Sequence, residues 1–233
     1  DPVARVFRTY GRVAPIRRVD GTLALCLPGA ALVDTTLSDG DVAFVVALLW
    51  GTTFDGLVAT PGWADAAAPV LDAGVPARVL YLGTLLAGFG LFYGAYRAAA
   101  RLARRTAPTY AAAGAIARRF GASLLPIAAG YHLAHYLDYF LGLSPALASA
   151  AVAPLAPEPL VLVVPGWFDI VGLFAVLLGH VLAVGVAHAV AFDAFPGRMQ
   201  AVRSQYPLTA VMVCYTVLSL WIVSQPSITP PGL

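Results

Sequence analysis

The stretch WFDIVGLFAVLLGHVLAVGVAHAVAF, residues 167–192, decides the fold of this chain. It contains one carboxylate, Asp169, and no arginine. A helix needs about 20 mostly apolar residues to cross the hydrocarbon core of a bilayer, and this stretch exceeds that length. Residues 167–192 are therefore predicted to form a transmembrane helix.

Four further apolar runs are long enough to cross a membrane, and they cover residues 42–59, 79–100, 121–143 and 208–223. Because only helices and closed barrels satisfy their backbone hydrogen bonds in lipid, continuous runs of this length indicate helices. The composition agrees: 11% of the residues are charged, against roughly 25% in soluble domains. The predicted fold class is all-α, a polytopic transmembrane helix bundle with about five spanning helices.

The arginines predict how the bundle is oriented. Of the 14 basic residues, all but Arg78 lie before the first run, around the connection of the second and third, or between the fourth and fifth. The positive-inside rule makes that side cytoplasmic. We therefore expect a multi-pass protein of the cytoplasmic membrane with its N-terminus inside and its C-terminus outside. The lipid bilayer is the expected partner, and the absence of a basic block argues against nucleic acid.

The chain divides into residues 1–41, a cytoplasmic-side segment, and residues 42–233, the transmembrane domain. Val3, Val6, Phe7 and Tyr10 recur at helical spacing with arginines opposite them. This pattern is typical of a short helix that lies on the membrane surface.

Ionisable residues inside the predicted spans are the candidate functional residues, because they are costly in lipid and usually face the bundle interior. The third span contains His132 and His135, the fourth contains His180 and His188, and the first contains Asp55. A rise of about 1.5 Å per residue places His132, His135, His180 and Asp55 near a common depth at the bilayer centre, with His188 closer to the cytoplasm.

Several imidazoles and a carboxylate at one depth suit a divalent transition metal. The sharpest hypothesis is that zinc or iron is held by His132, His135, His180 and Asp55. His188 is a further candidate ligand. A water molecule bound to the metal would then be available for hydrolysis. Haem b between facing helices is the alternative cofactor. A metal-ion or proton transporter or channel, and plain packing of the histidines, also remain open. No residue is assigned as catalytic.

Four motifs around these residues are similar to those of a known family: TFDGLVATP at 53–61, LLPIAAGYHLAHY at 124–136, GHV at 179–181 and SQYPL at 204–208. They resemble the polytopic bacterial and archaeal membrane proteins labelled fenitrothion hydrolase-like, and the likeness covers nearly the whole chain. The resemblance implies a membrane-bound hydrolase of organophosphorus triesters, and the candidate ligands stand at the family's motif positions. It also implies further membrane helices, from a preceding part of the chain or from partner subunits.

Overall fold

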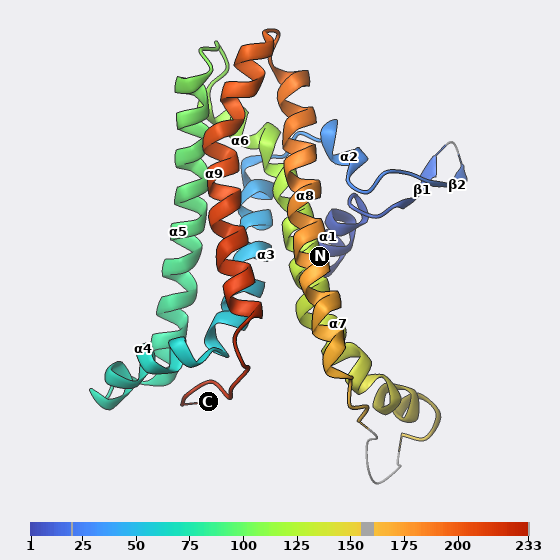
Figure 1. The fold of residues 1–233 in the computed structure, drawn as a ribbon, viewed down its shortest axis with the longest axis vertical. Helices are drawn as coiled ribbons and strands as arrows, with labels where there is room; N and C mark the ends of the chain where they lie inside the picture. The colour runs from blue at the N-terminus through green and yellow to red at the C-terminus, as the bar shows by residue number, and fades with distance from the viewer. Residues whose placement is uncertain (20, 155–160, 233) are drawn as a thin grey trace.

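The computed structural model describes residues 1–19, 21–154 and 161–232, and helices dominate this part of the chain (Figure 1). Among the described residues, five long helices run along the molecule: α3 (Asp39–Val58), α5 (Ala77–Thr106), α7 (Leu125–Val152), α8 (Asp169–Ala194) and α9 (Arg198–Val223). The predicted all-α helical bundle is confirmed.

Shorter elements connect and flank the long helices. The helical ones are α1 (Pro2–Gly11), α2 (Ala30–Val33), α4 (Pro61–Asp72), α6 (Ala113–Phe120) and two 3-10 turns, η1 (Gly121–Leu124) and η2 (Gly166–Phe168). Strands β1 (Ile16–Val19) and β2 (Thr22–Leu25) form an antiparallel hairpin, which projects sideways from the bundle (Figure 1).

The two ends of the bundle differ in charge. The α5–α6 connection and the turn between α8 and α9 lie at one end (Figure 1). We call this the arginine-rich end, because Arg101, Arg104, Arg105, Arg198 and Arg203 belong to it. The opposite end, called here the C-terminal end, holds α4 and the chain terminus (Figure 1).

Four of the described helices are long and apolar enough to cross a membrane: α3, α5, α8 with η2, and α9. The fifth, α7, has the length, but His132, His135 and Asp138 interrupt its apolar run. The protein is therefore a multi-pass membrane protein. Helix α7, whose apolar run is interrupted by ionisable residues, carries His132 and His135 of the candidate functional residues.

Two predicted spans differ most in their bounds from the helices of the structure. The run 208–223 belongs to a helix that already begins at Arg198, because a helix can continue past its apolar part through polar turns. The run 121–143 is divided between η1 and α7, which extends to Val152. Hydropathy detects the apolar part of a helix, whereas the backbone hydrogen bonds set its ends.

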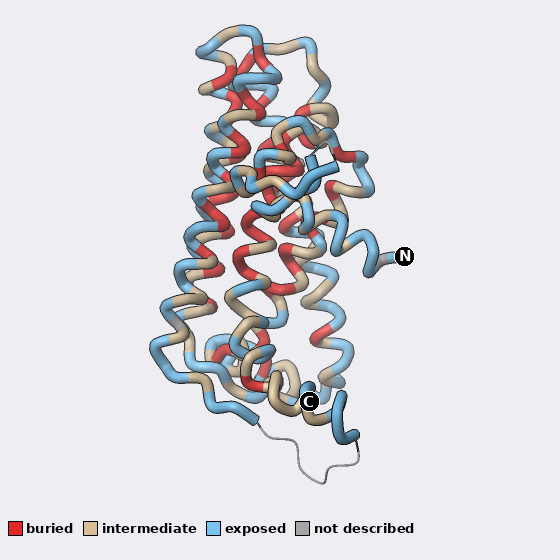
Figure 2. Tube along the Cα trace, turned by 90° about the vertical axis from the view of Figure 1, so that its right-hand side faces the viewer, coloured by how far each residue is buried: buried red, intermediate tan, exposed pale blue. Residues whose placement is uncertain are grey.

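The packed core is concentrated toward the arginine-rich end. Most buried positions lie on the inward-facing sides of the helices, in the upper and middle parts of the view (Figure 2). Toward the C-terminal end, a separate small cluster consists of Tyr131, Val176 and Ile222. Polar residues on α3 and α7 therefore lie beside the more thinly packed part of the bundle.

Helices α7 and α8 approach each other closely because glycines face each other where they cross. A Cβ atom on Gly130 would lie 2.4 Å from the carbonyl oxygen of Ala175, and one on Gly179 would lie 2.4 Å from that of Pro126. Small residues at a helix crossing let the backbones pack directly in a membrane protein. This contact holds α7 in place, and with it the residues that α7 presents to α3.

Candidate functional site

Helices α3 and α7 pair polar residues at two successive turns. Thr52 contacts His132, and Asp55 contacts His135. On each helix the two positions differ by three residues, so they share one helix face. We call the Thr52–His132 contact the inner rung and the Asp55–His135 contact the outer rung, which is nearer the C-terminal end.

The outer rung joins a carboxylate to an imidazole. Nε2 of His135 lies 2.7 Å from Oδ2 of Asp55, and the Tyr136 hydroxyl donates to the same oxygen at 3.4 Å. The His135 side chain is 29% exposed and that of Asp55 is 55% exposed. An ionised carboxylate only accepts hydrogen bonds, so the imidazole N–H is the donor. When the imidazole also carries a second proton, the contact becomes an ion pair.

The inner rung is more enclosed, since Thr52 is buried whereas Asp55 is exposed. Tyr10 of α1 takes part in it. The Thr52 hydroxyl lies 2.7 Å from Nδ1 and 2.9 Å from Nε2 of His132, and the Tyr10 hydroxyl lies 2.9 Å from Nδ1. The Ala128 carbonyl, 3.0 Å from Nδ1, can only accept, which favours a proton on that nitrogen. Burial raises the pKa of Tyr10 above the ordinary value of a phenol, so its hydroxyl keeps its proton at neutral pH.

A cavity of about 470 Å³ lies beside the outer rung. Asp55, His135 and Tyr136 line it together with Gln225 and Ser227, which follow α9. Liquid water occupies about 30 Å³ per molecule, so the cavity has room for several. The outer rung can therefore exchange protons with water.

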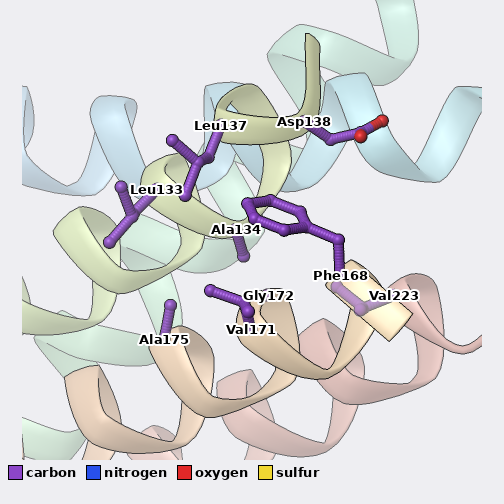
Figure 3. Close-up of a pocket in the computed structure, with 9 residues that line it drawn as sticks. All are labelled: Leu133, Ala134, Leu137, Asp138, Phe168, Val171, Gly172, Ala175 and Val223. Atoms are coloured by element: carbon purple, nitrogen blue, oxygen red, sulfur yellow. The ribbon is translucent and has the colours of Figure 1, made fainter. Parts of the chain in front are cut away.

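A smaller cavity of about 80 Å³ adjoins it between α7 and α8 (Figure 3). Leu133 and Leu137 of α7 and the ring of Phe168 line it, whereas the carboxylate of Asp138 points away from them (Figure 3). Asp138 also lines the larger cavity. Its carboxylate therefore adds negative charge near the outer rung, while the small cavity offers an apolar wall.

The two histidines of α8 lie outside the rungs. Nδ1 of His180 donates to the Val176 carbonyl at 2.7 Å, and its buried Nε2 has no hydrogen-bond partner among the described residues. His188 is exposed, with Nδ1 3.1 Å from Oε1 of Gln205. Each α8 histidine is thus held by its own local partner.

Within the described ranges, no group of three or more His, Cys, Asp or Glu side chains is placed to hold a metal ion. Of the predicted ligands His132, His135, His180, His188 and Asp55, the hydrogen bonds directly join His135 and Asp55. Similar depth in separate helices does not make a common site, because each helix's rotation decides where its side chains point. The metal and haem hypotheses remain predictions.

Asp55 lies in the last part of α3. It stands three residues before Val58, the last residue of that helix. This position brings Asp55 next to the cavity.

Sequence reasoning missed Thr52 and Tyr10 as partners of His132. A signal for Thr52 existed, because its spacing from Asp55 equals that of His132 from His135. When polar residues on two helices have the same spacing, each polar residue of one helix can contact one of the other. No comparable signal existed for Tyr10, which lies far away in the sequence.

No protein-family model, curated protein or solved structure matches this chain. The resemblance to the fenitrothion hydrolase-like proteins therefore stays a prediction.

Proposed function

We propose that the protein is a membrane transporter or channel for protons, in which Asp55 and His135 exchange protons with the cavity at the C-terminal end. The observation that carries the proposal is the pair of rungs, which places two imidazoles one helical turn apart, each beside an oxygen of α3. Imidazole changes its charge between pH 5 and 8 more readily than any other ordinary side chain, which suits it to proton transfer.

The proposed path begins in the cavity. His135 takes a proton from water, and Asp55 stabilises the resulting imidazolium at 2.7 Å. His132 stands about 4.5 Å further along the helix axis, close enough for transfer through one water molecule. From His132 the proton passes toward Tyr10, whose neutral hydroxyl both donates and accepts.

Proton flux into liposomes tests this function. The full chain is reconstituted with a pH-sensitive dye inside, and a potassium diffusion potential drives the flux. We expect Asp55→Asn and His135→Gln to lower the flux about tenfold or more, since each removes a group that carries or stabilises the proton. His188→Gln is the matched control, because it removes an exposed imidazole outside the rungs, and it should leave the flux unchanged. Absence of flux in the wild type, or equal flux in all variants, would contradict the proposal.

Metal binding at the outer rung is the second candidate, favoured because Asp55 and His135 both line the cavity. Zinc or iron would need at least a third ligand, from another segment or subunit. Elemental analysis of the purified protein separates the candidates. About one metal per chain, lost in His135→Ala but kept in His180→Ala, would assign a metal to the outer rung and make metal-assisted hydrolysis worth assaying.

We also propose that the arginine-rich end faces the cytoplasm of a cell-membrane protein, with the N-terminus inside and the C-terminus outside. The concentration of arginines at that end supports this orientation. The long exposed faces of the helices support contact with lipid and with further membrane helices. In this orientation the cavity at the outer rung opens outward.

A further inference from the structure

A third cavity, of about 410 Å³, lies at the arginine-rich end, on the opposite half of the bundle from the outer rung. It is lined by α6, by the last turn of α8 and by Thr36, which precedes α3. Its polar wall consists of Thr36, Arg118, Arg119 and Asp193. Neither rung includes any of these residues, so the proposed proton path does not explain why they lie together.

Positive charge is in excess at this cavity. Arg97 and Arg118 share one carboxylate, that of Asp39, at 2.9 and 3.3 Å. Arg119 pairs with Asp193. Of these residues, Arg118, Arg119 and Asp193 line the cavity, whereas Arg97 and Asp39 lie outside its lining. Three guanidinium groups thus face two carboxylates, which leaves one positive charge without a counterion among these groups.

The guanidinium groups also keep hydrogen-bonding capacity. Arg119 donates to Thr36 at 3.3 Å as well as to Asp193, yet its buried Nε has no partner within the described residues. Each guanidinium has five N–H donors, and the contacts of Arg118 to Asp39 use few of them. Two neighbouring arginines with spare donors match the oxygens of a phosphate group, which arginine binds through paired hydrogen bonds.

The rest of the cavity wall is apolar. Ala111, Ala115 and Ala194 line it and keep part of their surface exposed. Ile116, Phe120 and Phe195 lie buried behind this surface. An inorganic anion would gain nothing from such a wall. A molecule with a phosphate at one end and hydrocarbon at the other would use both parts, and basic pockets between membrane helices bind lipid headgroups in this way.

We propose that this cavity binds an anionic phospholipid, with Arg118 and Arg119 donating to its phosphate and with Ala111, Ala115 and Ala194 contacting its glycerol and upper acyl region. The site is separate from the proton path and does not depend on it. It would join α6, α8 and the start of α3 at the membrane surface.

Native mass spectrometry of the full chain, released from detergent with added phosphatidylglycerol or phosphatidylcholine, tests the proposal. We expect the wild type to retain about one phosphatidylglycerol and to bind phosphatidylcholine more weakly. Arg118→Gln should lower the retained phosphatidylglycerol roughly fivefold, since one arginine near an anionic lipid contributes about 1 kcal/mol. Arg105→Gln is the matched control, because Arg105 is exposed at the same end and outside the cavity.

Arg119→Gln also removes the contact with Asp193 and can weaken folding, so Arg118→Gln is the deciding variant. Equal retention in Arg118→Gln and Arg105→Gln would overturn the proposal, as would equal binding of the two lipids. Displacement of the lipid by millimolar inorganic phosphate would instead assign the cavity to a free anion and overturn the lipid assignment.

Discussion

At the scale of single residues, His132 has the most crowded polar environment in the site. Its Nδ1 lies within 3.0 Å of three oxygens, which belong to Tyr10, Thr52 and Ala128. The Thr52 and Ala128 oxygens come from the two helices of the rung, whereas Tyr10 comes from α1. Tyr10 is therefore the contact that can be removed without disturbing the pairing of α3 with α7.

We predict that Tyr10→Phe lowers proton flux several-fold while the fold persists. The substitution removes a hydroxyl 2.9 Å from His132 and keeps the buried ring, so the free energy of unfolding should fall by only about 1 kcal/mol. Flux in liposomes and the midpoint of thermal unfolding are measured together. Tyr110→Phe is the control, since Tyr110 is fully exposed. Unchanged flux in Tyr10→Phe would exclude Tyr10 from the path.

At the scale of elements, α7 carries ionisable side chains and also has to pack inside a bundle of apolar helices. His132, His135 and Asp138 place three ionisable side chains in its apolar run, yet it must pack along the bundle. The contact with α8 provides this packing, because Gly130 and Gly179 let the backbones of α7 and α8 approach each other closely. Pro126 is consistent with this arrangement, because it lies in the first turn of α7, where a missing N–H costs nothing.

We predict that Gly130→Ala separates α7 from α8 and destabilises the protein. The new Cβ would lie 2.4 Å from a backbone oxygen of α8, which cannot move aside without shifting that helix, and overpacking of this kind costs about 1–3 kcal/mol. Thermal unfolding in detergent measures the effect. Gly172→Ala is the matched control on α8, where a Cβ has its nearest neighbour at 3.6 Å, an ordinary contact distance. Equal unfolding midpoints for the two variants would show that the glycine contact does not limit stability.

At the scale of the whole molecule, the two ends of the bundle have separate roles in our proposals. The arginine-rich end holds most of the buried core and the lipid cavity, and the C-terminal end holds the water-accessible cavity and the outer rung. Because the five long helices alternate in direction along the chain, the α5–α6 connection and the C-terminus lie at opposite ends (Figure 1). They should therefore lie on opposite sides of the membrane.

We predict that cysteine labelling in intact cells distinguishes the two ends. With Cys26 and Cys214 replaced by serine, a cysteine at Thr229 should react with a membrane-impermeant maleimide from outside. A cysteine at Tyr110 should react only after the cells are permeabilised. Both positions are exposed in the fold. The reverse pattern would invert the proposed orientation, and equal labelling of both positions from one side would contradict an odd number of crossings.

The candidate site was only partly predictable from the sequence. Asp55, His132 and His135 could be selected, because an ionisable residue in an apolar run is conspicuous in itself. His180 was grouped with them by depth, yet it donates to Val176 of its own helix. Its rotation around α8 depends on how α8 packs against α7, which hydropathy does not report.

The sequence by itself determined that this is a bundle of membrane helices and which of its polar residues are unusual. Both follow from the free energy of transferring each side chain from water into lipid. These free energies add along an apolar run of sequence and do not depend on which helix packs against it. Only the tertiary structure decided that Asp55 meets His135, that Thr52 and Tyr10 meet His132, and that α8 keeps its histidines apart from them. Those contacts depend on the rotation and pairing of helices far apart in the chain, and close packing between specific side chains settles these.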